Sequence, residues 1–233
     1  MLDSKRLIVA LDFPDTASTE AMLTQLDPAL CRVKVGKELF TRGGPQLVEH
    51  IHQRGFEVFL DLKFHDIPST VAGAVKAAAE LGVWMVNVHA SGGSAMMRAA
   101  REVLGYESST LLIAVTVLTS LGREDLEEVG LNVDPESHVL RLAQLAKASG
   151  MDGVVCSAQE IRSIRAALDS GFLLVTPGIR PASDSKDDQK RTQTPAEAIS
   201  NGGDFLVIGR PITQAPDPRL KLRQVIEEIQ SRK

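Results

Sequence analysis

Cysteine is rare in this sequence, and neither sign of charge predominates. Only Cys31 and Cys156 occur among the 233 residues, and each lies in an apolar run. We interpret them as two buried thiols rather than a disulfide, which fits a reducing compartment. The formal net charge is -4, so the composition gives no indication of a basic surface that would bind nucleic acid.

Long apolar runs are also lacking. No stretch reaches the roughly 18 apolar residues that a membrane-spanning helix needs, and the apolar part of the N-terminal segment is interrupted by Asp12. We therefore predict a cytoplasmic protein that has no membrane partner. Hydrophobic residues nevertheless make up 43% of the chain, which is enough to build a sizeable core.

Short apolar runs rich in β-branched residues recur along the whole chain. Their nearly continuous hydrophobicity is typical of strands that are buried on both faces, as in parallel sheets. The eight predicted strands are 7–12, 32–36, 57–63, 85–90, 111–118, 153–157, 172–178 and 205–209. Segments with helical periodicity lie between them. Several of these end in a glycine, which can take the positive φ that terminates a helix: Gly55, Gly82, Gly105, Gly150 and Gly171.

Eight alternating strand and helix units predict an α/β fold of the TIM (β/α)8 barrel type, with residues 1–233 as a single domain. A doubly wound open sheet is the alternative for such an alternation. In a barrel, functional residues belong at the carboxyl ends of the strands. Charged and polar residues do follow that pattern, namely Asp12, Lys34, Lys37, Asp61, Lys63, His89, Thr119 and Arg210.

The stretch DLKFHDIPST at 61–70 carries the densest charges. Asp61 and Lys63 are two residues apart on a predicted strand, so their side chains should project from one face. Lys34 on the neighbouring strand should lie beside Asp61, whose carboxylate would raise the pKa of Lys34 and keep it protonated. A protonated lysine suits proton donation or stabilisation of a carbanion, whereas a Schiff base needs a neutral amine.

Two further residues of this stretch leave alternatives open. Asp66 directly precedes a predicted helix, so it is either an N-terminal cap or helix-dipole partner, or a functional carboxylate. His65 could join Asp66, Asp61 and His89 in ligating a divalent metal. Because Lys63 would place a positive charge among those ligands, we favour a structural His65 and no metal.

Two motifs in the last third of the chain indicate a phosphate-binding site. VTPGIRP at 175–181 and LVIGRPI at 206–212 each place Gly and Arg directly after a predicted strand. The loops after the seventh and eighth strands of such barrels often bind a phosphate through backbone N–H groups, and Arg210 could add a bidentate contact. The polar stretch 181–195 has no apolar anchor. It is either a solvated surface loop or, as we favour, a mobile lid over the phosphate.

Several motifs share one resemblance. They are LDF at 11–13, VKVGKELF at 33–40, DLKFHDIPST at 61–70, VTVLTS at 115–120, TPGIRP at 176–181 and IGRPI at 208–212. Together they resemble the orotidine 5'-phosphate decarboxylases of bacterial pyrimidine synthesis. The resemblance spans essentially the whole chain, and DLKFHDIP is its most specific motif.

This resemblance implies that the chain converts orotidine 5'-phosphate to uridine 5'-phosphate and CO2 without a cofactor, as a homodimer of barrels with shared sites. It implies that Lys63 protonates C6 of the pyrimidine, that Asp61 faces the substrate carboxylate, and that Lys34 completes the charge array and contacts the ribose. Asp66 and Thr70 would reach into the partner's site. The other implied substrate contacts are Asp12 at a ribose hydroxyl, Thr119 at the pyrimidine, Pro177, and Arg180, Gln189, Gly209 and Arg210 in the phosphate region.

Two other functions compete with this one. A related barrel, 3-keto-gulonate 6-phosphate decarboxylase, shares the Asp-x-Lys-x-x-Asp pattern but uses Mg²⁺ and an enediolate intermediate. A nucleotide-binding protein without catalysis could keep the barrel and the phosphate site. The Lys34 array and the long polar stretch with Gln189 argue against the first, and the intact set Lys34, Asp61, Lys63 and Asp66 argues against the second.

Overall fold

The computed structural model describes residues 5–181 and 193–230, and its centre is a closed barrel of eight parallel strands. Neighbouring strands pair in sequence order, and the last strand pairs with the first. This confirms the predicted TIM barrel and excludes the open sheet. The strands are β1 (Leu7–Ala10), β2 (Arg32–Gly36), β3 (Val58–Phe64), β4 (Met85–His89), β5 (Leu111–Val115), β6 (Gly153–Val155), β7 (Leu173–Thr176) and β8 (Phe205–Ile208).

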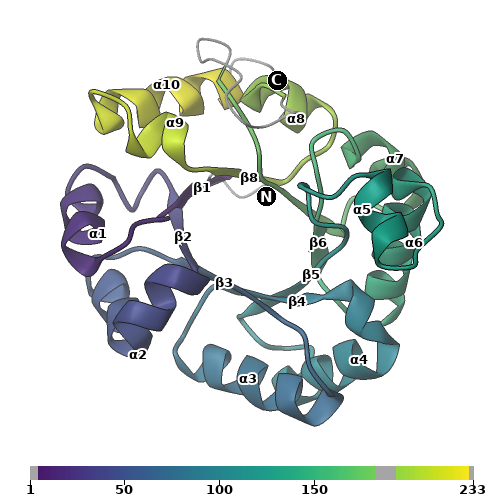
Figure 1. Cartoon of the computed structure of the whole chain (residues 1–233). Coiled ribbons are helices and arrows are strands. Elements are labelled where there is room, and N and C mark those ends of the chain that lie inside the picture. The colour runs from purple at the N-terminus through teal and green to yellow at the C-terminus, as the bar shows by residue number, and fades with distance from the viewer. Residues whose placement is uncertain (1–4, 182–192, 231–233) are drawn as a thin grey trace.

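Helices form a ring around the barrel (Figure 1). They are α1 (Thr16–Leu23), α2 (Lys37–Gln53), α3 (Pro68–Glu80), the short 3-10 helix η1 (Ala90–Gly92), α4 (Gly93–Leu104), α5 (Arg123–Glu128), α6 (Pro135–Ala148), α7 (Ile161–Ala167), α8 (Pro195–Ser200), α9 (Arg210–Thr213) and α10 (Pro218–Gln230). Helical segments therefore follow every strand, as the alternating pattern predicts.

Two details of the helices add to or differ from the sequence-based prediction. The helical segment predicted between the second and third strands is α2, which begins directly after β2 at Lys37 and bends at Gly44, where φ is 59°. The positive φ predicted after the helices is found at Gly55, Gly82, Gly105 and Gly150. The prediction is wrong at Gly171, because α7 has already ended at Ala167 with Leu168 in an extended conformation.

The barrel separates two apolar layers. One layer packs the strands against the surrounding helices. The other fills the barrel interior with residues that alternate along the strands, as period-two geometry requires; its buried members are Ile8, Ala10, Phe59, Met85, Ile113, Val175, Phe205 and Val207. Because both faces of the strands are buried, the near-continuous hydrophobicity of the strand sequences is explained.

A buried arginine fills the amino-terminal end of the barrel. Arg32 begins β2 and is 4% exposed. Its guanidinium lies 4.0 Å from the ring centroid of Trp84 and 5.5 Å from that of Phe205. A cation over aromatic faces is attracted by their π electrons. With this end packed, the room for a ligand lies at the opposite, carboxyl end of the strands.

The two cysteines are buried free thiols, as predicted from their apolar context. Burial raises the pKa of Cys31 to about 12, and it also raises the pKa of Cys156. Both groups are therefore protonated and unreactive near neutral pH. Within the described ranges, no helix is long and apolar enough to cross a membrane.

Gly153, at the start of β6, allows a test of how tightly the barrel packs. A Cβ at this position would overlap the backbone carbonyl of Leu173 on β7, which has no way to swing aside. We expect Gly153→Ala to lower the free energy of unfolding by about 1–3 kcal/mol, measured by urea denaturation.

Gly73, on the exposed side of α3, serves as the matched control. No atom lies within 4 Å of a Cβ built there. Gly73→Ala should leave the stability unchanged or raise it by up to about 1 kcal/mol, because alanine favours the helix. Equal stability of both variants would contradict this account of β6–β7 packing.

Candidate active site

A cavity of about 310 Å³ opens at the carboxyl ends of the strands. Most of the site residues predicted from the sequence line it: Asp12, Lys34, Asp61, Lys63, Thr119, Pro177, Arg180, Gly209 and Arg210. The sequence analysis missed its apolar walls, which include Phe59, Val115, Val117, Leu118, Val155 and Val207. These apolar residues come from the barrel interior and the β5 loop, and nothing in their local sequence separates them from ordinary core residues.

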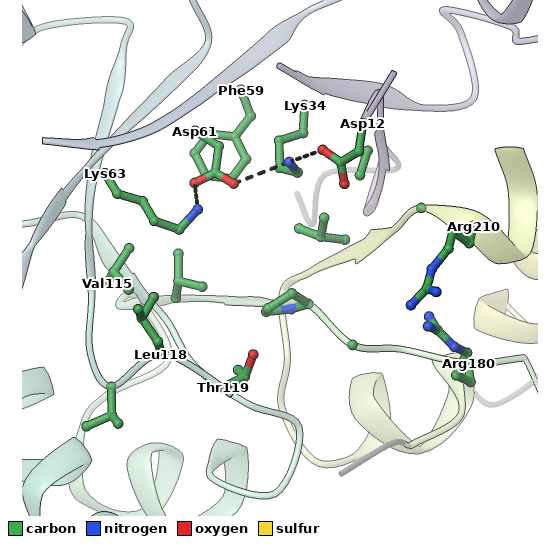
Figure 2. Close-up of a pocket in the computed structure, with 17 residues that line it drawn as sticks. Asp12, Lys34, Phe59, Asp61, Lys63, Val115, Leu118, Thr119, Arg180 and Arg210 are labelled. Atoms are coloured by element: carbon green, nitrogen blue, oxygen red, sulfur yellow. Dashed lines mark hydrogen bonds and ion pairs between the residues drawn. The ribbon is translucent and has the colours of Figure 1, made fainter. Parts of the chain in front are cut away.

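Four charged side chains form a continuous row along one wall of the cavity (Figure 2). Lys63 Nζ donates to Asp61 Oδ1 at 2.5 Å, and Lys34 Nζ lies 3.3 Å from Asp61 Oδ2. Lys34 Nζ also donates to Asp12 Oδ1 at 2.9 Å. The order is therefore Lys63, Asp61, Lys34, Asp12, with each carboxylate beside at least one ammonium.

Burial and pairing compete at the centre of this row. Lys34 and Asp61 are each 8% exposed. Burial by itself raises the pKa of Asp61, but the ammonium groups of Lys34 and Lys63 outweigh it and hold that pKa below its usual value. Burial likewise lowers the pKa of Lys34, but Asp61 and Asp12 outweigh it and raise that pKa. Both groups are therefore charged at neutral pH, as the sequence analysis predicts for Lys34.

The backbone at the end of β3 is irregular. Lys63 has φ of 52°, the only positive value among the described residues other than glycine. β3 pairs regularly with β4 up to Leu60, and the register shifts before the next pair at Phe64. Asp61 and Lys63 do lie together, as predicted, but a distorted strand end brings their side chains into contact. The sequence contains no glycine there that would have predicted a positive φ.

The sequence analysis also missed Asn87 on β4. Its side chain is fully buried; Nδ2 donates to Asp61 Oδ1 at 2.7 Å, and Oδ1 accepts from the backbone N–H of Lys63 at 2.7 Å. The available signal was a polar residue in the middle of the otherwise apolar stretch MVNV at 85–88. A buried amide of this kind needs polar partners, and here they belong to the charged row.

Two arginines lie at the other end of the cavity. In Figure 2 the guanidinium groups of Arg180 and Arg210 point toward one another. Arg180 is 8% exposed, and its Nε has no hydrogen-bond partner within the described part of the chain. Gly178, which also lines the cavity, has φ of 76°, a conformation that favours glycine. Two converging guanidinium groups in a partly buried cavity form a favourable environment for an anion.

Asp66 and Thr70 do not line this cavity. Both are exposed and lie past β3, at the start of α3. Asp66 is not the N-cap of α3, because that position is Ile67. The Asp66 carboxylate accepts from the Ile67 N–H at 2.6 Å, beside the helix N-terminus, as the dipole-partner alternative allows. Gln189 and most of the predicted lid 181–195 lie outside the described residues.

His65 lies against His89, and their ring centroids are 5.4 Å apart. Burial, followed by the nearby charges of His65, Lys37 and Lys63, lowers the pKa of His89 to about 4, so its ring is neutral at pH 7. In residues 5–181 and 193–230, no three His, Cys, Asp or Glu side chains are grouped as a metal site would require.

The family model and the relatives found by comparison with known proteins all name the same family. A sequence model described as "Orotidine 5'-phosphate decarboxylase / HUMPS family" matches residues 5–225. A protein of Teredinibacter turnerae is 59% identical over 226 residues, which cover 97% of this chain and 97% of the relative. A protein of Chromohalobacter salexigens is 62% identical over 224 residues, covering 96% and 95%. Both relatives are named orotidine 5'-phosphate decarboxylase.

The solved structures agree with the sequences. The crystal structure of orotidine 5'-phosphate decarboxylase from Lactobacillus acidophilus superposes with a TM-score of 0.87 at 39% identity, covering 97% of this chain and 99% of that one. The residues 5–225 that the family model matches include all eight strands, the charged row and the two arginines. This chain therefore belongs to the orotidine 5'-phosphate decarboxylase / HUMPS family.

Proposed function

We propose that this protein decarboxylates orotidine 5'-phosphate to uridine 5'-phosphate and CO2, as a cytoplasmic enzyme of de novo pyrimidine biosynthesis. The observation that carries the proposal is the buried Asp61 carboxylate held between the ammonium groups of Lys34 and Lys63 in the cavity. The names of relatives about 60% identical support the same substrate. Asp61 would lie beside the carboxylate of orotidine 5'-phosphate and repel it. Such repulsion does not help a protein that only binds the nucleotide.

Lys63 supplies the chemistry in this proposal. When the bond between C6 and the carboxyl carbon breaks, CO2 leaves and the electron pair stays on C6 in an orbital that the ring delocalises poorly. A fixed ammonium beside C6 stabilises that charge. Lys63 then transfers a proton from Nζ to C6, becomes a neutral amine and recovers a proton from solvent. No bond of the reaction requires a metal or an organic cofactor, and we propose that none takes part.

Asp61 and its other partners orient the reacting groups. Asp61 accepts from Lys63 Nζ at 2.5 Å and so fixes the direction of the ammonium. Its negative charge also disfavours the substrate carboxylate in the ground state and ceases to do so once CO2 has left. In this proposal Lys34 and Asp12 hold the ribose, and Thr119 and Pro177 contact the bound nucleotide.

The phosphate would bind at the arginine end. Arg180 and Arg210 point toward one another there (Figure 2), and Gly209 immediately precedes Arg210 in the cavity wall. The phosphate takes no part in bond breaking. Its binding energy can still lower the barrier if it holds the pyrimidine against the charged row, because remote contacts can be realised in the transition state.

We also propose a homodimer with shared sites. Asp66 and Thr70 are exposed at the junction of β3 and α3 and do not line the cavity, and Ile67 between them is 64% exposed. A carboxylate, a hydroxyl and a large apolar side chain in one exposed segment are suited to packing against a second copy. Asp66 of the partner subunit would then complete the site.

Replacing Lys63 tests the mechanism. We expect Lys63→Ala to lower kcat on orotidine 5'-phosphate by at least about 100-fold, because both the proton donor and the stabilising charge are lost. Loss of substrate absorbance measures the rate. Lys76→Ala, which removes an exposed lysine on α3, is the control and should retain full activity. Full activity in Lys63→Ala would refute the proposed role.

The same assay with EDTA separates this proposal from the Mg²⁺-dependent sugar-phosphate decarboxylase. We expect EDTA to leave the rate unchanged. Activity that appears only on a 3-keto sugar acid phosphate, and that EDTA abolishes, would establish the alternative.

Replacing Arg210 tests the phosphate site. Arg210→Ala should lower kcat/KM for orotidine 5'-phosphate by about 10- to 100-fold, because a charge-assisted contact to the phosphate is lost. The same change should have little effect on orotidine, which lacks the phosphate. Arg141→Ala, on the exposed side of α6, provides the control. Equal losses on both substrates would argue against a phosphate contact.

Mixing two inactive variants tests the shared site. Lys63→Ala and Asp66→Ala, combined and allowed to exchange subunits, should recover about a quarter of the wild-type activity, since half of the dimers carry one intact site of two. Lys63→Ala mixed with the double variant Lys63→Ala/Asp66→Ala should recover none. A lack of recovery in the first mixture, with exchange verified, would place Asp66 in its own subunit's site.

A further inference from the structure

Asn87 occupies a position in the barrel wall that is otherwise apolar. It lies in the middle of β4 with no exposed surface, between the buried residues Val86 and Val88. A buried amide is costly unless its donor and acceptor are both bonded. Both are bonded here, and both partners belong to β3: Asp61 through its carboxylate and Lys63 through its backbone N–H.

This amide lies in the irregular part of the sheet. β3 pairs with β4 at Leu60–Val86 and next at Phe64–Val88. Between these pairs β3 has three residues, Asp61 to Lys63, where β4 has only Asn87. A bulge of this kind leaves backbone groups without their ladder partners and redirects side chains. The Asn87 side chain replaces one missing ladder bond by accepting from Lys63 N at 2.7 Å.

The strain at Lys63 makes this contact informative. A lysine with φ of 52° is unfavourable and persists only where the surroundings impose it. The Asn87 amide bonds both to the Lys63 backbone and to the Asp61 carboxylate. Asp61 Oδ1 accepts from Asn87 Nδ2 and from Lys63 Nζ. The backbone and the side-chain end of Lys63 are thus both tied to one side chain on the next strand.

We propose that Asn87 is a positioning residue for the reaction: its amide imposes the left-handed backbone of Lys63 and the orientation of Asp61, and thereby directs the Lys63 ammonium at the substrate. The proposal rests on the proposed function for its catalytic consequence, but its structural consequence can be measured independently. Asn87 itself is fully buried and is not among the residues that line the cavity.

The first experiment uses Asn87→Ala, which removes both hydrogen bonds. We expect kcat on orotidine 5'-phosphate to fall about 10- to 100-fold through misplacement of Lys63. The Kd for uridine 5'-phosphate should change less than about threefold, because the phosphate end is intact. Met85→Ala is the matched control: Met85 lies on the same face of β4 and is equally buried, but its side chain has no hydrogen-bond donor. It should lower stability without lowering kcat.

The second experiment uses Asn87→Asp. This variant keeps an acceptor for Lys63 N–H but places a second carboxyl group beside Asp61. Like charges at this distance favour protonation of one carboxyl group, and the protonated form again donates to Asp61. We therefore expect the kcat of Asn87→Asp, relative to wild type, to increase as the pH is lowered. A role in stability alone predicts no such dependence.

The crystal structure of Asn87→Ala gives a readout that does not depend on the substrate. We expect Lys63 to leave the left-handed region or its Nζ to move off Asp61. An unchanged Lys63, with kcat within threefold of wild type, would overturn the proposal, as would an equal loss of kcat in Met85→Ala. If Asn87→Ala does not fold, Asn87→Thr, which is close in size and lacks the amide, takes its place with the same expectations. Absence of decarboxylation in the wild type would refute the proposed function, while the Lys63 conformation would still decide the role of Asn87.

Discussion

The site depends on one electrostatic constraint: the Asp61 carboxylate must stay charged where burial alone would discharge it. Two ammonium groups, from Lys34 and Lys63, lower its free energy enough to keep it ionised. Each neighbour then has a reason for its place. Asp12 pairs with the Lys34 ammonium, and Asn87 Nδ2 donates to Asp61 Oδ1. Removing any member would leave another buried charge incompletely paired, so the row acts as a unit.

The barrel makes this row possible because it places the strands that carry the four charged residues next to one another. β1, β2 and β3 are parallel neighbours, so their carboxyl ends meet at the same edge, and the register pairs Ala10 with Lys34 and Gly36 with Asp61. Arg32 and the aromatic rings around it fill the opposite end. The cavity floor is therefore built on packed core. A rigid base matters because charged groups stabilise a transition state most when they need no rearrangement during the reaction.

The charged row and the two arginines come from different parts of the barrel. The charged row comes from the first three strands, whereas Arg180 and Arg210 follow β7 and β8. Apolar residues of the barrel interior and the β5 loop complete the cavity lining. In the proposed function, this division would let the phosphate contacts and the proton donor be optimised separately, although both act on one substrate.

The sequence by itself determined the α/β class and favoured the barrel, since eight apolar runs alternate with helical segments, and the closed strand order of the structure excluded the open sheet. It also identified Asp12, Lys34, Asp61, Lys63, Arg180 and Arg210 as candidates, because a charge at the end of an apolar strand is conspicuous. Only the tertiary structure showed the contacts of Asn87, the left-handed backbone of Lys63 and the apolar walls of the cavity. The physical reason is that each depends on a neighbour across the sheet: an asparagine within a strand becomes informative only when the bulge opposite it leaves Asp61 and Lys63 in need of partners.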